Sequence, residues 1–183
     1  RLLNLQKEKL KYRIKIKEIK NNFLSKDLSG DKIPIYNVEY TQKKPFEKIS
    51  SKSNKYIFSC FDIATKLIKS KKILGIINCP VSKEFLFKNK HGGITEFLSK
   101  KAGVEGKEVM LIYNKKLSTS PLTTHIPLSQ VSNKISKSKI VKKIKTIFNF
   151  YKRNFNKNPN IAVLGLNPHN FSAAKKSEEK EII

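Results

Sequence analysis

The sequence predicts an α/β fold in which helices cover a mostly parallel sheet. Residues 56–69 place apolar side chains at helical spacing, and residues 73–77 (ILGII) follow as a short, continuously apolar run. Such a run is typical of a central parallel strand that is buried on both faces. Residues 136–156 and 161–164 repeat the order of helix and strand. This alternation is the pattern of a doubly wound α/β sheet.

The first fifty-odd residues show weaker patterns. Residues 2–10 fit a helix only loosely, whereas residues 12–17 (YRIKIK) alternate apolar and charged side chains like a half-buried edge strand. Residues 33–40 (IPIYNVEY) predict a second strand, and the polar residues 41–54 predict a surface loop.

The segment after the predicted buried strand is expected to carry short helices and a returning pair of strands. Ser82 is a candidate cap for a helix over residues 83–86. The glycine pair after His91 precedes a second short helix, where free backbone N–H groups suit an anion, although an ordinary tight turn explains it equally well. Residues 109–113 predict a strand, and residues 115–124 are expected to return beside it.

Two of the three histidines follow predicted strands. His125 lies in the sequence TTHIPL (residues 123–128), and His169 ends the sequence GLNPH (residues 165–169). In open α/β sheets, ligands gather beyond the carboxyl ends of the strands. Two histidines delivered to that edge could hold one divalent metal ion between them. The alternative is that each histidine, with a proline next to it or two residues away, is a polar turn residue.

Length and composition set broad limits. The 183 residues suit one domain or a large part of a two-domain protein, and the 38% hydrophobic content suffices for a core. Cys60 and Cys79 have no neighbouring ligand at metal spacing, so we expect two buried thiols in a reducing compartment. We find no membrane-spanning run and no secretory signal pattern, and we therefore expect a cytoplasmic protein.

The formal net charge of +25 raises the alternative of a basic nucleic-acid-binding module. The excess is almost entirely lysine, which is spread along the whole chain, and only three residues are arginine. Arginine is the residue that makes bidentate phosphate and base contacts. We therefore expect no specific nucleic-acid recognition, but a general attraction for anionic ligands.

The ends of the chain look cut. It starts at Arg1 without a methionine, and residues 178–183 resemble the opening of a helix. We therefore expect a fragment.

Four sequences occur in a characteristic order: NCPVSKE (78–84), ITEF (94–97), TTHIPL and GLNPH. Together they resemble the 4-hydroxythreonine-4-phosphate dehydrogenase family of vitamin B6 biosynthesis. The resemblance is good over residues 56–183, which carry the substrate and metal motifs. Over residues 1–55, the N-terminal part of the α/β domain, it rests on element order alone. The C-terminal part of the family fold is expected to be absent from this fragment.

The resemblance implies a three-layer α/β/α fold like that of the isocitrate and isopropylmalate dehydrogenases, in a homodimer with the active site at its interface. It implies NAD-dependent oxidation of 4-phosphohydroxy-L-threonine, followed by decarboxylation, on the route to pyridoxal 5'-phosphate. The family's divalent metal ion (zinc, magnesium or cobalt) is held by three histidines, two of which match His125 and His169. Thr95 matches a position that contacts substrate. Lys83 is a candidate catalytic residue near the anionic substrate, or a solvated lysine.

Two departures from the family pattern limit these expectations. Ile94 replaces a histidine that contacts substrate, and isoleucine cannot donate a hydrogen bond. The third metal histidine and most cofactor-binding residues belong to the absent part, so the NAD contacts are unknown and this fragment alone is expected to be inactive. Three alternatives remain open: a dehydrogenase of a related phosphorylated four-carbon sugar acid, a catalytically dead family member, and the nucleic-acid-binding module.

Overall fold

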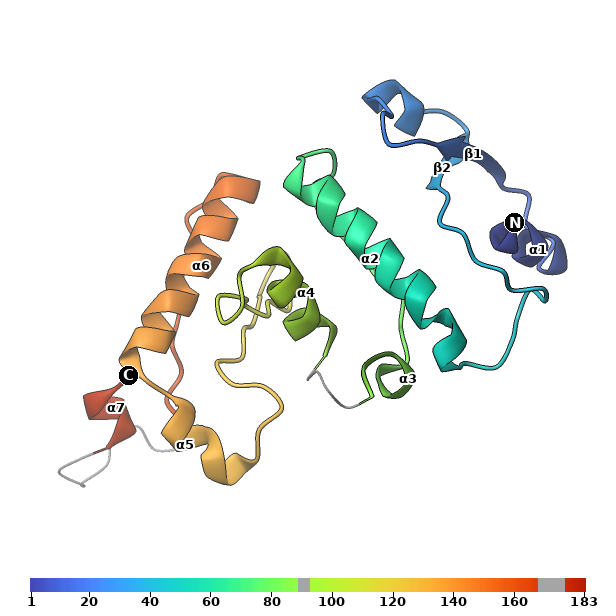
Figure 1. Cartoon of the computed structure of the whole chain (residues 1–183). Helices are drawn as coiled ribbons and strands as arrows, with labels where there is room; N and C mark the ends of the chain where they lie inside the picture. The colour runs from blue at the N-terminus through green and yellow to red at the C-terminus, as the bar shows by residue number, and fades with distance from the viewer. Residues whose placement is uncertain (89–92, 168–176) are drawn as a thin grey trace. The chain divides into compact units, whose positions relative to one another are not determined.

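The computed structural model describes residues 1–88, 93–167 and 177–183. The chain divides into two compact units, Arg1–His91 and Gly92–Ile183. Figure 1 labels α1, β1, β2, α2 and α3 in the first unit and α4 to α7 in the second. Each unit is described by itself.

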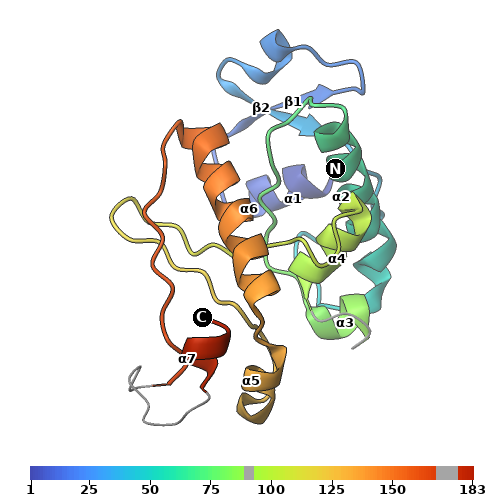
Figure 2. The ribbon, with the colours of Figure 1, turned by 90° about the vertical axis from the view of Figure 1, so that its left-hand side faces the viewer.

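The first unit joins a small parallel sheet to three helices. Strands β1 (Lys15–Ile19) and β2 (Lys32–Tyr36) pair in parallel, with Lys15 opposite Lys32. They lie side by side in Figure 2. Both predicted strands are therefore present, but the first covers Lys15–Ile19 rather than residues 12–17, and the second ends at Tyr36 rather than residue 40. The helices and 3₁₀ helices of this unit are α1 (Leu2–Lys9), Ser25–Leu28, Ser51–Ser53, α2 (Asn54–Lys69) and α3 (Lys83–Phe87).

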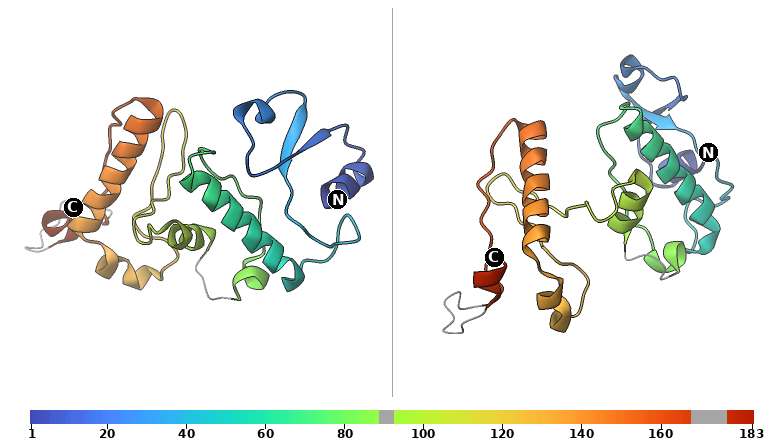
Figure 3. Two further views of the ribbon diagram at one scale, coloured as in Figure 1. Left: turned by 45° about the horizontal axis from the view of Figure 1, so that its top comes forward. Right: turned by 60° about the vertical axis from the view of Figure 1, so that its left-hand side comes forward.

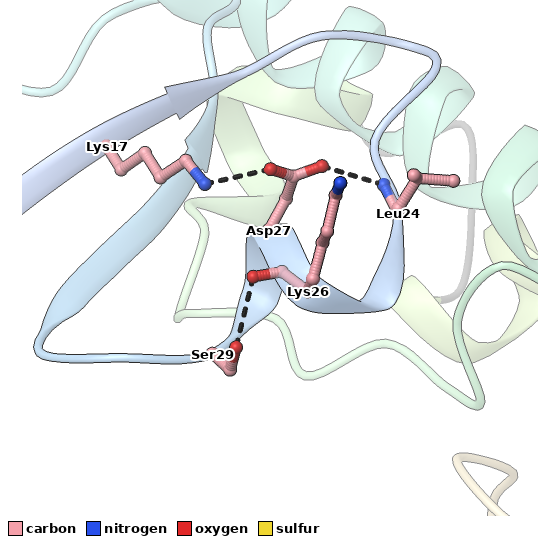
Figure 4. A network of polar contacts seen from close by, with 5 residues as sticks. All are labelled: Lys17, Leu24, Lys26, Asp27 and Ser29. Atoms are coloured by element: carbon pink, nitrogen blue, oxygen red, sulfur yellow. Dashed lines mark hydrogen bonds and ion pairs between the residues drawn. The ribbon is translucent and has the colours of Figure 1, made fainter.

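Asp27 organises the connection between β1 and β2 (Figure 4). Its carboxylate accepts a hydrogen bond from the backbone N–H of Leu24 at 2.9 Å and another from Lys17 Nζ at 2.8 Å. The backbone hydrogen bond from Leu24, and then the bond from Lys17, lower the pKa of this carboxyl below its ordinary value. The Asp27 side chain thus links the connecting segment, through Leu24, to strand β1, through Lys17.

Helix α2 confirms the predicted helix over residues 56–69 and begins two residues earlier. Phe61 is buried on its apolar face. At the start of the helix, Asn54 Nδ2 donates to the carbonyl of Phe85 at 2.7 Å, which attaches α3 to α2. Helix α3 follows Ser82, as predicted, but the Ser82 hydroxyl makes no capping hydrogen bond. Burial of Leu86 and Phe87 holds this short helix in place instead.

The prediction of a buried strand at residues 73–77 is wrong. This segment has no strand structure, and the exposures of Leu74 and Ile77 are 106% and 102%. Residues 161–164 likewise form no strand, and Leu164 is 84% exposed. Within the described residues, neither segment pairs with a neighbouring strand. An extended segment becomes a strand only when a neighbour satisfies its backbone N–H and C=O groups.

Cys60 is only partly buried and Cys79 is exposed, so the prediction of two buried thiols is wrong for Cys79. Cys79 follows closely on the exposed segment 73–77, which leaves it open to solvent.

The second unit is built around α6 (Lys137–Phe155), the longest helix of the described chain. It confirms the helix predicted over residues 136–156. Ser136 caps it by accepting a hydrogen bond from the backbone N–H of Lys139, and Asn156 ends it in the left-handed conformation. The chain then turns back and runs along the helix (Figure 3). The other helices are α4 (Ile94–Ala102), the 3₁₀ helix Leu128–Gln130, α5 (Val131–Lys134) and α7 (Glu178–Glu181).

Residues 109–124 form a much reduced version of the predicted strand pair. One antiparallel bridge joins Ile112 and Thr119, with N···O distances of 2.8 and 3.0 Å. The hydroxyl of Tyr151 on α6 donates to Ser118 Oγ at 2.8 Å, and the ring of Tyr113 stacks on Phe155 with centroids 5.3 Å apart. This arm is therefore attached to α6 by polar and aromatic contacts.

Within the residues that the structure describes, no helix is long and apolar enough to cross a bilayer.

Candidate active site

His125 lies at an exposed turn of the second unit. The returning arm of residues 115–124 leads into it, and the 3₁₀ helix at Leu128 follows it. Its φ angle is +56°, in the left-handed region that residues other than glycine rarely adopt. Neighbouring Thr123 and Thr124 are half-buried, so the imidazole is carried by a turn whose base is packed. The loop position agrees with the prediction, but the predicted strand before it is reduced to a single bridge at Thr119. The left-handed backbone of His125 is a strained conformation.

The base of this turn is held from both sides. Ser120 Oγ donates to the carbonyl of Met110 at 2.7 Å, across the arm. Lys143 Nζ, from α6, donates to the carbonyl of Pro121 at 3.1 Å. The segment that leads into His125 is thus attached to the long helix through the backbone of Pro121.

The second motif, GLNPH, begins in a loop that α7 organises. Glu179 Oε1 accepts hydrogen bonds from the backbone N–H groups of Leu166 and Asn167, at 3.1 and 2.9 Å. The Asn167 amide Nδ2 also donates to Glu179 Oε1 and Oε2, at 3.0 and 3.1 Å. The backbone bond from Asn167 is the main cause of the lowered pKa of Glu179. His169, the second predicted ligand, lies outside the described residues.

Ile94 and Thr95 occupy the first turn of α4, directly after Gly93. Ile94 is half-buried and Thr95 is exposed. The threonine hydroxyl is therefore available to a ligand, and the isoleucine presents only an apolar surface there. Of the glycine pair after His91, only Gly93 is described, and it occupies the N-cap position of α4.

Lys83 is the first residue of α3 and is exposed. It belongs to the first unit, whereas Ile94, Thr95 and His125 belong to the second. Its role near substrate stays a prediction.

Among the described residues, no group of three or more histidine, cysteine or acidic side chains is placed to hold a metal ion. The exposed imidazole of His125 has the chemistry of a metal ligand, since neutral imidazole nitrogen binds divalent transition metals. Within the described part, the site therefore offers one of the ligands that the sequence predicts.

Sequence reasoning missed a basic cavity beside this turn. It has a volume of about 370 Å³ and lies between residues 106–109, residues 122–124 with Ile126, Lys134 of α5, and α6. Lys139, Lys142 and Lys143 of α6 line it. Their spacing places them along one side of the helix. Lysine is so frequent in this chain, however, that the spacing did not distinguish these three lysines from the others.

The chain matches known proteins along most of its length. A family model described as "Pyridoxal phosphate biosynthetic protein PdxA" matches residues 2–183. A 4-hydroxythreonine-4-phosphate dehydrogenase of Sulfurihydrogenibium sp. is 33% identical over 159 residues, which is 85% of this chain and 48% of that protein. The corresponding Aquifex aeolicus protein is 41% identical over 99 residues, or 53% of this chain and 31% of that protein. The chain thus spans about half the length, or less, of these relatives.

Solved structures show the same fold. A protein from Salmonella typhimurium, described as a 4-hydroxythreonine-4-phosphate dehydrogenase, superposes with a TM-score of 0.80 at 24% identity. The alignment covers 98% of this chain and 56% of that one. The Klebsiella pneumoniae enzyme of the same name gives a TM-score of 0.72 at 23% identity, over 91% of this chain and 52% of that one. These neighbours confirm the predicted α/β fold class. Since the family model spans nearly the whole chain, the chain belongs to the PdxA family of pyridoxal phosphate biosynthetic proteins.

Proposed function

We propose that the whole protein is an NAD-dependent dehydrogenase that oxidises 4-phosphohydroxy-L-threonine with the help of a divalent metal ion. Decarboxylation of the oxidised product follows, on the route to pyridoxal 5'-phosphate. The family match over residues 2–183, with the TTHIPL and GLNPH motifs retained, is the observation that carries this proposal. We further propose a cytoplasmic homodimer with the active site at its interface.

His125 and His169 are the proposed metal ligands of this chain. The first is supported by the exposure of the His125 imidazole, in a turn whose preceding residue Pro121 accepts a hydrogen bond from Lys143 of α6. The described structure supports the second through the loop of residues 166–167, where two backbone N–H groups and the Asn167 side-chain amide donate hydrogen bonds to Glu179. When bound, the metal ion (zinc, magnesium or cobalt) would polarise the substrate hydroxyl, and NAD would accept the hydride. Each imidazole must be neutral to ligate, so metal binding should weaken in acid.

Thr95 is the proposed substrate contact on α4, where its exposed hydroxyl can hydrogen-bond to a ligand. Lys83 is proposed to act electrostatically on the anionic substrate.

Ile94 favours a second candidate substrate. A site that loses a hydrogen-bond donor discriminates less strongly for a substrate group that the donor would bind. A phosphorylated four-carbon sugar acid, which shares the phosphate and hydroxyl groups of the hydroxy amino acid, is the alternative substrate.

The test compares kcat/KM of the whole protein for 4-phosphohydroxy-L-threonine and for the phosphorylated four-carbon sugar acid. The proposal expects a preference for the hydroxy amino acid. A strong preference for the sugar acid would refute the vitamin B6 assignment. For the nucleic-acid alternative, duplex affinity that falls steeply with salt would support it, and absent binding would eliminate it.

A further inference from the structure

The cavity beside the His125 turn concentrates positive charge. Five lysines line its volume of about 370 Å³, together with a single acidic residue, Glu108. The five are Lys107, Lys134, Lys139, Lys142 and Lys143. None of them forms a salt bridge with a carboxylate among the residues that the structure describes.

Three of these ammonium groups are held in place by backbone carbonyls. Lys142 Nζ donates to Gly106 at 3.1 Å, Lys143 Nζ donates to Pro121 at 3.1 Å, and Lys139 Nζ donates to Lys134 at 2.9 Å. An ammonium group has three N–H donors, so each retains two after this contact. For the half-buried Lys143, this contact also lowers the entropy that would be lost when a ligand orders the side chain.

Of the five lysines, only Lys143 is half-buried, and the other four are exposed. Burial lowers the pKa of Lys143 below its ordinary value, and the nearby negative charge of Glu108 opposes this only in part. An anion in the cavity would favour the charged form of the lysine and would meet the remaining N–H donors. The hydroxyl-bearing residues Thr123, Thr124 and Thr146 also line the cavity. A group with several oxygen acceptors and more than one negative charge suits such a set of donors.

We propose that this cavity binds the phosphate group of a small phosphate monoester. Its volume lies within the range of small-molecule sites and exceeds what one phosphate ion would fill. The lining residues include none of those predicted to contact metal or substrate. They do include Thr123, Thr124 and Ile126, so an occupant contacts the turn that carries His125. The proposal does not rest on the dehydrogenase assignment.

The experiment titrates the whole protein with inorganic phosphate as the probe, by isothermal titration calorimetry. The variants are Lys142→Gln, which changes an exposed lysine, and the double change of Lys142 and Lys143 to Gln. Lys152→Gln is the matched control, because it removes the same charge from an exposed position of α6 outside the cavity. Thermal melts of each variant establish that it is folded.

We expect the double variant to bind phosphate at least about tenfold more weakly, since a hydrogen bond to a charged group is worth roughly 1.5 kcal/mol or more. The Lys152 control should stay within about twofold of the original affinity. Equal weakening in the control, or no binding at all, would overturn the proposal, because only the general positive charge would then attract anions.

A second arm identifies the source of the phosphate group. If it belongs to the enzyme's own substrate, Lys142→Gln raises KM and substrate competes with phosphate. If it belongs to another phosphorylated metabolite, KM is unchanged and phosphate still binds to the substrate-saturated enzyme. Both results support a phosphate site in the cavity.

Discussion

The left-handed backbone at His125 has a cost that two substitutions at the same position can measure. His125→Ala and His125→Gly both remove an exposed imidazole, so the two variants lack the same ring and its interactions. The remaining difference between them is the Cβ atom and its effect on the backbone. At a φ of +56°, a side chain with a Cβ atom crowds the following carbonyl, whereas glycine does not.

The size of the difference follows from two opposing effects. The left-handed conformation costs an L-residue roughly 1–2 kcal/mol. Glycine lowers the free energy of unfolding by about 0.4–1 kcal/mol relative to alanine, because the unfolded chain with glycine has more conformations to lose on folding. The difference between these two ranges is about 0–1.6 kcal/mol, so we expect the glycine variant to have the larger free energy of unfolding, by about 0.8 kcal/mol.

The assay is urea unfolding of the whole protein, comparing the two variants under one set of conditions. Ser129 in the adjacent 3₁₀ helix provides the control, because it is not among the residues with positive φ. There the order should reverse, and Ser129→Ala should be more stable than Ser129→Gly. Equal stability of the two His125 variants, or a more stable alanine, would show that the turn does not hold a left-handed residue.

Three further predictions concern the core, the second motif and the substrate position. Phe87→Ala should lower the free energy of unfolding by about 3–5 kcal/mol, because the Phe87 side chain is only 3% exposed. Phe85→Ala on the same helix should lower it clearly less in the same unfolding assay, because Phe85 is 37% exposed. Because the folded pKa of Glu179 is lowered, its contribution is present above its unfolded pKa and lost as the pH falls through the folded value. The protection factor of the Leu166 amide, which is its exchange rate relative to the unfolded chain at the same pH, should accordingly fall in acid, and Glu179→Gln should remove that dependence; a protection factor that does not change with pH would contradict the assignment. Ile94→His should lower KM for the hydroxy amino acid by about tenfold, and an unchanged KM would show that the position does not face substrate.

Helix α6 shows what local sequence information can predict. Its apolar stripe, the capping Ser136 and the left-handed Asn156 all lie within the helix or next to it. The prediction therefore needed no knowledge of distant residues. The bounds agree to one residue at each end.

The segments 73–77 and 161–164 show where such information ends. Their apolar runs predict that the side chains are buried between neighbouring elements. A strand, however, forms only by hydrogen bonding to another strand, and the apolar run does not specify which segment that is. In the described residues the strands that do pair are β1 and β2, whose crossover depends on Asp27. That single carboxylate had no distinctive sequence pattern.

The candidate site was predictable in part. The motif order identified the family and placed His125 in a loop after an extended arm, as the structure shows. The left-handed backbone of His125 was not predictable, because it depends on how Pro121 and Ser120 are held by other segments. The lysine-lined cavity combines residues 106–109 with α6, which lies well apart from them along the chain, and only the fold brings them together.

The most direct test of the proposed function is NADH formation by the whole protein with 4-phosphohydroxy-L-threonine, before and after removal of divalent metal by a chelator. We expect activity that disappears on chelation and returns with added metal. His125→Ala should lose both bound metal and turnover, while Ser129→Ala, an exposed position in the following 3₁₀ helix, should keep both. Turnover that persists without metal, or in the His125→Ala variant with its metal content unchanged, would contradict the metal-assisted mechanism.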